Sequence, residues 1–159
     1  SQVAWAAGPQ PDVQAEMKKM QEAQAKLMAA MMSEKRSRLG FSETVAALQD
    51  AAKKRGWEVG QTMDMQAAML KAGHKEAKRF TVLTMCKKDL AESLLKAQAE
   101  NKAMPFAPCR MSVFEGSDGK VYIAKPNTEL MAQMAASAFA PMLNKFVEEE
   151  KALLAGIAE

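Results

Sequence analysis

Apolar side chains recur every three or four residues after the first dozen positions of this chain. The stripe comprises Met17, Met20, Leu27 or Met28, and Met31, with the polar Gln24 within it. The segment contains no Gly or Pro, and its charged residues mostly lie off the stripe, which is typical of a helix with one apolar face. Asp12 is suited to cap its N-terminus. The pattern predicts an amphipathic helix over residues 12–30 that packs on its own domain or on a partner chain.

The middle of the chain mixes helical and alternating patterns. Strands are predicted over residues 31–39, 57–59 and 79–85, helices over 43–55, 65–72 and 89–99, and a hairpin over 111–115 and 120–124. Ser42 and Asp64 are expected to cap two of the helices, and Leu90, Leu94 and Leu95 to face inward from the third. This order predicts an α+β fold whose sheet has four or five mainly antiparallel strands, covered by helices on one side.

The last segment has the pattern of a long helix that begins after Asn127 or Thr128. Its apolar face comprises Leu130, Met134, Ala138, Met142 and Phe146, and Pro141 should kink or divide it. Met131, Met134 and Met142 are expected to contribute to a core. The two terminal helices are also the predicted contact surfaces, through Met17, Met20, Leu27, Met28, Met134, Met142 and Phe146.

Length and composition favour a single globular domain. The chain has 159 residues, of which 48% are hydrophobic and 26% charged, so a wholly disordered chain is excluded. The net charge is +3, but basic and acidic residues are interleaved, so no nucleic-acid partner is expected. No stretch approaches the roughly 20 apolar residues that a membrane-spanning helix needs.

Two sets of residues resemble a known family. The first is Met32–Val45, with its Gly-Phe-Ser-Glu-Thr-Val sequence, followed by Arg55-Gly56-Trp57; the second is Pro108–Glu115, with its Pro-Cys-Arg. Together they resemble the family called domain of unknown function 302. The resemblance implies a small α+β fold with a curved antiparallel sheet, association as dimers and no established reaction. It also implies that Cys86 and Cys109 stand where family members often carry cysteines.

The resemblance divides the chain into four parts. Residues 1–11, which contain Gly8, Pro9 and Pro11, are predicted to form an extended arm, and residues 12–30 the amphipathic helix. Residues 31–127 form the family-like domain, and residues 128–159 an added helical segment. The small residues that follow Ser1 are typical of a chain from which a signal peptide has been removed, so export to the periplasm or beyond is expected.

The two cysteines allow a disulfide, a thiol pair or two buried apolar side chains. In a split β-α-β arrangement, the end of one strand and the start of the next lie at opposite ends of the sheet. A direct bridge between Cys86 and Cys109 is therefore not expected.

The remaining chemistry is limited by the single histidine. Cys86, Cys109, His74 and Arg110 are candidate ligands, and Met17, Met20, Met28, Met31 and Met32 are candidate thioether ligands, since soft sulfur selects Cu(I). Copper or non-covalent haem are the candidate cofactors, whereas c-type haem is excluded because the chain has no C-x-x-C-H. No catalytic motif is present, so no catalytic residue is assigned.

Three hypotheses about function follow. The first is a non-enzymatic, exported binding or assembly module that forms a homo-oligomer or joins a complex. The second is a soft-ligand protein that binds Cu(I), haem or a sulfur species. The third is a thiol-dependent redox enzyme.

Overall fold

The computed structural model describes residues 8, 10–100 and 109–159. The chain forms two units, Ser1–Ala30 and Met31–Glu159, whose relative positions are not determined, and each is described by itself. Most of the predicted arm lies outside the described residues, as does Pro108 of the family-like Pro-Cys-Arg sequence.

The first unit contains one helix, α1 (Val13–Ala30). Asp12 caps it as predicted, because its Oδ1 accepts a hydrogen bond of 3.1 Å from the backbone N–H of Ala15. None of its 18 residues is buried. The helix predicted from the apolar stripe is confirmed, because the structure has a continuous helix over Val13–Ala30.

The second unit is built on one antiparallel sheet of five strands in the order β1-β5-β4-β3-β2. The strands are β1 (Met32–Arg36), β2 (Glu58–Asp64), β3 (Phe80–Cys86), β4 (Arg110–Glu115) and β5 (Val121–Pro126). β4 and β5 form the predicted hairpin, and β2 runs further than the short strand predicted after Trp57. The α+β fold with an antiparallel sheet is confirmed.

Five helices complete this unit: α2 (Phe41–Lys54), α3 (Met65–Lys71), α4 (Lys88–Glu100), α5 (Thr128–Met134) and α6 (Ala140–Leu154). Asp64 caps α3, and Asn127 caps α5, each through a side-chain oxygen. The prediction that Ser42 caps α2 was wrong. The cap is Gly40 in an extended conformation, and the Ser42 hydroxyl instead accepts a hydrogen bond of 2.8 Å from Arg79.

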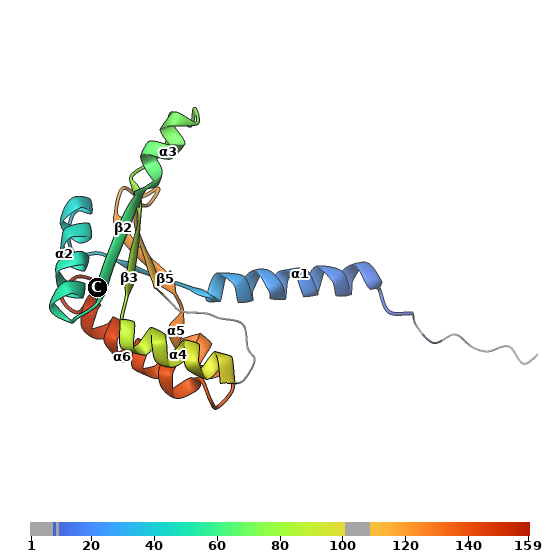
Figure 1. Cartoon of the computed structure of the whole chain (residues 1–159). Coiled ribbons are helices and arrows are strands. Elements are labelled where there is room, and N and C mark those ends of the chain that lie inside the picture. The colour runs from blue at the N-terminus through green and yellow to red at the C-terminus, as the bar shows by residue number, and fades with distance from the viewer. Residues whose placement is uncertain (1–7, 9, 101–108) are drawn as a thin grey trace, which may run out of the picture. The chain divides into compact units, whose positions relative to one another are not determined.

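The main core lies on one face of the sheet, where α2 and the C-terminal end of α6 pack. Alternate strand residues point into it, including Leu83 and Met85 of β3 and Met111 and Val113 of β4. Figure 1 shows the sheet nearly edge-on, with α2 on this side and with α4, α5 and α6 below its lower end. The prediction that helices cover one side of the sheet is confirmed.

A second core cluster joins α4, α5 and α6. It contains Leu90, Ala91, Leu94, Ala132, Leu143 and Phe146, all buried. Two predicted core residues lie outside it: Leu95 is 45% exposed and Met134 is 60% exposed. Pro141 stands in the first turn of α6, so the long C-terminal helix is divided in two.

The C-terminal segment belongs to this unit, which extends from Met31 to Glu159. The chain after α6 pairs with the chain after β1: Arg38 N–H donates to Ile157 O at 2.8 Å, and Glu159 N–H donates to Arg36 O at 2.9 Å. Leu153, Leu154 and Ile157 also lie in the main core. Residues 128–159 are therefore structural parts of the domain.

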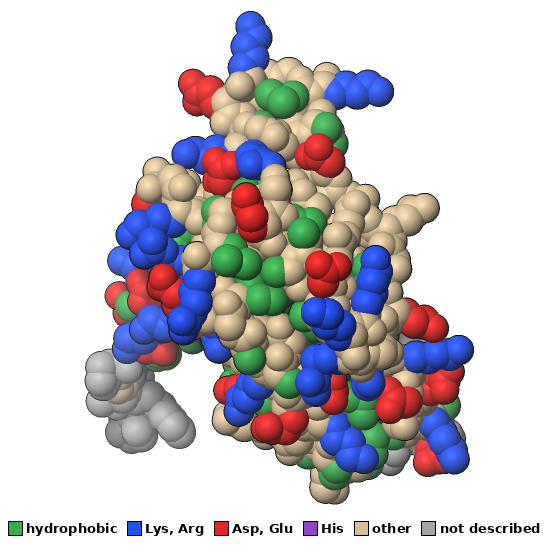
Figure 2. Space-filling model, turned by 90° about the vertical axis from the view of Figure 1, so that its left-hand side faces the viewer, with side chains coloured by type: hydrophobic (Ala, Val, Ile, Leu, Met, Phe, Trp, Pro, Cys, Tyr) green, Lys and Arg blue, Asp and Glu red, His purple; other side chains and the backbone are tan. Residues whose placement is uncertain are grey.

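The surface is mixed in charge. On the side that α2 occupies, Lys and Arg side chains are interspersed with Asp and Glu around a central group of hydrophobic side chains (Figure 2). Among the described residues, no helix has both the length and the apolar character needed to cross a membrane.

Candidate functional site

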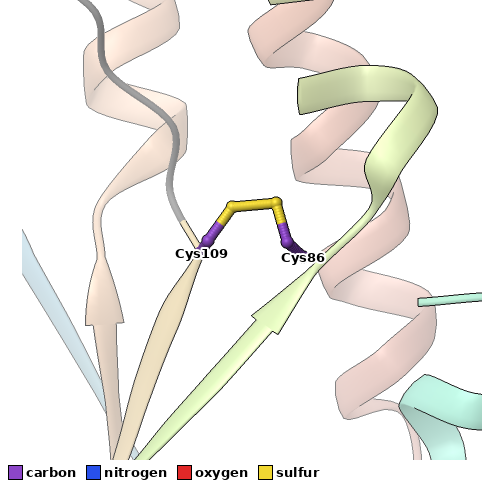
Figure 3. The surroundings of a disulfide bond; sticks show 2 residues. All are labelled: Cys86 and Cys109. Atoms are coloured by element: carbon purple, nitrogen blue, oxygen red, sulfur yellow. A yellow bond between two sulfur atoms is a disulfide. The ribbon is translucent and has the colours of Figure 1, made fainter. Parts of the chain in front are cut away.

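Cys86 and Cys109 form a disulfide, with a Cα–Cα distance of 4.7 Å. Cys86 is the last residue of β3 and Cys109 immediately precedes β4. The two side chains point toward each other from neighbouring strands (Figure 3). Our expectation of no direct bridge was wrong, because β3 and β4 are adjacent and antiparallel. The end of one such strand and the start of the other lie at the same end of the sheet.

The disulfide is half-buried. The backbone N–H of Met85 donates to Cys109 O at 2.9 Å, and the Cys86 side chain packs against the second core cluster. Of the nearby cations, the Lys87 ammonium donates to Arg55 O at 2.7 Å, and that of Lys88 lies 3.9 Å from Glu58 Oε1. These contacts are typical of a disulfide that cross-links two strands at a packed end of the sheet.

The other two candidate ligands do not complete a site with this disulfide. His74 follows α3 and is exposed. In the pairing of β2 with β3, Glu58 lies opposite Cys86, whereas Asp64, which leads into α3, lies opposite Thr81 at the other end. His74 is thus at the opposite end of the sheet from the sulfurs. Arg110 is next to Cys109 but exposed. Among the described residues, no group of three or more His, Cys, Asp or Glu side chains could hold a metal ion.

The candidate methionines stand mainly in α1. Met17, Met20 and Met28 are 55%, 63% and 74% exposed, and Leu27 is 47% exposed. Met31 is half-buried, and Met32, at the start of β1, is exposed. The apolar side chains of α1 therefore form an exposed stripe.

The stripe of α1 follows a heptad pattern, written abcdefg. Met17 and Gln24 occupy a positions, and Val13, Met20 and Leu27 occupy d positions. Its three lysines, Lys18, Lys19 and Lys26, all fall at b or c, and Glu22 falls at f. Glu16, at g, is the charged residue nearest the stripe. A face of a, d, e and g positions that is almost free of charge is typical of a helix that packs on another helix.

The predicted contact residues of the C-terminal segment do not form a matching surface. Phe146 is fully buried in the second cluster, and Met142 is half-buried against it. Phe146 is thus a core residue, and its assignment as a contact residue was wrong. Met134 alone of the three is exposed.

A buried ion pair is a feature that the sequence analysis missed. The Lys125 ammonium lies 2.9 Å from Glu150 Oε2, and the Glu150 side chain is 2% exposed. Burial raises the pKa of Glu150, more than the Lys125 ammonium lowers it. A signal was present: Glu150 is four residues after Phe146 and four before Leu154, on the apolar side of α6, and Lys125 continues the inward positions of Val121 and Ile123.

A second carboxylate joins α6 to α2. Glu149 accepts hydrogen bonds of 3.3 Å from Arg55 Nε and from Trp57 Nε1. Burial raises the pKa of Glu149, but the hydrogen bonds from Arg55 and Trp57 outweigh it, so that this pKa is lowered. The arrangement fastens the end of α2 to the middle of α6.

Comparison with known proteins adds a fold and a family. A crystal structure of an uncharacterized conserved DUF302 protein from Bacillus stearothermophilus is similar, with a TM-score of 0.67 and 20% sequence identity. The match covers 79% of this chain and 96% of that chain. No curated protein matches. The family described as "Domain of unknown function DUF302" matches residues 33–157, and therefore includes α5 and α6 but not α1. The chain belongs to the DUF302 family.

Proposed function

We propose that this protein is a non-enzymatic assembly module that associates with further copies of itself through α1. One observation carries the proposal: α1 is an 18-residue helix with no buried residue and an uncharged heptad stripe. Because most of the stability of a helix in a protein comes from packing of its amphipathic face, burial of that stripe is the natural source of the stability of α1. The helix lies outside the residues that match the family, so the proposal concerns a property of this chain.

A second copy of α1 is the partner that the pattern fits best. Parallel or antiparallel pairing would bring Met17, Met20 and Leu27 of one copy against the same stripe of another. Gln24 is the one polar residue at an a position, and such a residue sets register and oligomeric state at some cost in stability. Ala23, Met28 and Ala30 at e and g widen the apolar face, which suits a bundle of helices as well as a pair.

We also propose that the protein works in an oxidising compartment. The disulfide between Cys86 and Cys109 supports this, since such bonds persist in secreted and periplasmic proteins and are rare in the cytosol. The soft-ligand hypothesis has less support. The two cysteine sulfurs that it needs as ligands are bonded to each other, and His74 lies at the other end of the sheet.

Sedimentation equilibrium of the full chain over a wide concentration range tests self-association. The test variant is Met20→Glu with Leu27→Glu, which places charge at two d positions. The matched control is Ala15→Glu with Ala25→Glu, which adds the same charge at f and b positions of the same helix. Removing two burial sites of about 1.5–3 kcal/mol each should weaken association of the test variant by at least tenfold.

The control should associate as the unchanged protein does. A monomer at every concentration for the unchanged chain would contradict the proposal. Equal weakening by both variants would also contradict it, because the effect would then follow net charge and not the stripe.

A further inference from the structure

The helix α3 projects from one end of the sheet. β2 leads into it at Asp64, which caps it, and the chain returns from it to β3 at Phe80. Figure 1 shows α3 extending beyond the end of the sheet, away from α4, α5 and α6. None of its seven residues is buried, and every residue from Ala67 to Glu76 is exposed. Packing within the domain therefore does not account for the apolar side chains of α3.

Exposed apolar side chains gather on this projection. Outside α1, the described residues include seven large hydrophobic side chains that are exposed, and three of them, Met63, Met69 and Leu70, fall within eight consecutive positions. These three are 52%, 41% and 47% exposed. A group of exposed apolar side chains, unlike a single one, marks a surface that contacts a protein or a membrane.

The backbone holds Met69 and Leu70 in an ordered turn. Gly73, at a φ of 96°, donates its N–H to Leu70 O at 3.0 Å, and His74 donates its N–H to Met69 O at 3.0 Å. These two hydrogen bonds form the Schellman ending of a helix, in which the left-handed conformation favours Gly. Met69 and Leu70, the apolar tip of α3, are thus displayed by a helix end that is already ordered, so little conformational freedom is lost on binding.

Basic side chains accompany the apolar tip. The segment of residues 65–78 carries three exposed lysines, Lys71, Lys75 and Lys78. It carries one carboxylate, Glu76, so three positive charges and one negative charge leave +2, whereas Asp64 lies at the opposite end of α3, where it caps the N-terminus. At the top of Figure 2, the height of α3, Lys or Arg side chains project beside hydrophobic ones. This combination is complementary to a bilayer surface, which has anionic headgroups above an apolar interior.

We propose that the apolar tip of α3 docks the domain on the surface of an anionic membrane. Met69 and Leu70 enter the boundary between headgroups and acyl chains, and the three lysines lie among the anionic headgroups. A second copy of this chain presents the same excess of positive charge, which opposes contact between two tips. The attachment is peripheral and reversible, because so small a contact binds far more weakly than a membrane-spanning helix. It goes beyond the proposed self-association and uses a different part of the chain.

Flotation of the full chain with lipid vesicles tests the docking. The probes are mixed vesicles of phosphatidylcholine and phosphatidylglycerol, and neutral vesicles of phosphatidylcholine alone. At low salt, binding to the mixed vesicles should be at least about tenfold tighter than binding to the neutral ones, because only the mixed vesicles attract the lysines. Added salt should remove most of this difference, since it screens exposed charges.

A first pair of variants tests the apolar tip. Met69→Glu with Leu70→Glu should weaken binding to the mixed vesicles at least about tenfold, because it places charge where apolar side chains enter the lipid. The matched control is Leu95→Glu with Met134→Glu, which adds the same charge at exposed apolar positions of α4 and α5. The control should weaken binding by less than about threefold, through net charge alone.

A second pair of variants tests the lysines. Lys71→Gln with Lys75→Gln should weaken binding to the mixed vesicles about tenfold or more, because each lysine near the surface contributes to the attraction. The matched control, Lys53→Gln with Lys54→Gln, removes the same charge from exposed positions of α2 and should weaken binding by less than about threefold. The melting temperature of each variant reports whether the fold is kept. The lysine pair still tests the contact should the glutamate variant unfold.

Equal binding to neutral and mixed vesicles would overturn the proposal, and so would an equal loss in a tip variant and its control. Altered sedimentation of the lipid-free Met69→Glu with Leu70→Glu variant, with vesicle binding unchanged, would overturn it too, because the tip would then contact protein. All of these comparisons leave α1 unchanged, so failure here is distinct from failure of the proposed self-association.

Discussion

The helices α1 and α6 have similar apolar spacing but different surroundings. α6 buries six residues, Leu143, Phe146, Val147, Glu150, Leu153 and Leu154, between two core clusters. α1 is three residues longer than the 15-residue α6 and buries none. Periodicity predicts that a helix has an apolar face, but what covers that face depends on contacts far away in the sequence. The two helices therefore support different roles, α6 in folding and α1 in association.

The largest expected effect is in α6. Phe146→Ala should lower the free energy of unfolding by about 3–5 kcal/mol, because it leaves a cavity in the second core cluster. Leu27→Ala in α1 is the matched change and should alter the unfolding of the monomeric domain by less than about 0.5 kcal/mol. Urea denaturation at low protein concentration measures both. Similar losses in the two variants would contradict the division between the helices.

The disulfide should have the next largest effect. It closes a separation of 23 residues, so reduction should lower the free energy of unfolding by about 3 kcal/mol. The helicity of α1 should not change, since the bond lies within the other unit. The variant Cys86→Ala with Cys109→Ala should show no response to the reductant. An unchanged free energy on reduction would show that the bond does not stabilise the domain.

The smallest expected effect is at Glu149. Glu149→Gln should cost about 1 kcal/mol at neutral pH, because it weakens the hydrogen bonds from Arg55 and Trp57. The pKa of Glu149 is lowered in the folded chain, so its contribution is present above the ordinary value of 4.5. It is lost as the pH falls through the lower, folded pKa. The difference between Glu149→Gln and the unchanged chain should therefore shrink in acid, and a difference that grows in acid would contradict this.

Much of the fold follows from local sequence signals. The turn at Gly116–Gly119 lies between two alternating runs, and Asp64 and Asn127 are placed to cap α3 and α5. These features depend on residues close together in the chain, so their patterns are visible without the fold. Pro141 likewise identified the division of the C-terminal helix.

The site residues were harder to predict because their partners are distant in the sequence. Pairing of Cys86 with Cys109 depends on β3 lying beside β4. The ion pair of Lys125 with Glu150 depends on α6 packing against β5, and neither residue is unusual alone. Leu95 and Met134 have the spacing of core residues, yet both side chains are exposed in the part of the chain that the structure describes.

Hydrogen exchange of the unchanged chain, measured by mass spectrometry at low and high protein concentration, tests the central claim most directly. Protection of α6 amides should be the same at both concentrations, because the domain itself covers that helix. Protection of α1 amides should be low in dilute protein and should rise with concentration as copies associate. Protection of α1 that is equal at both concentrations, whether high or low, would contradict the account.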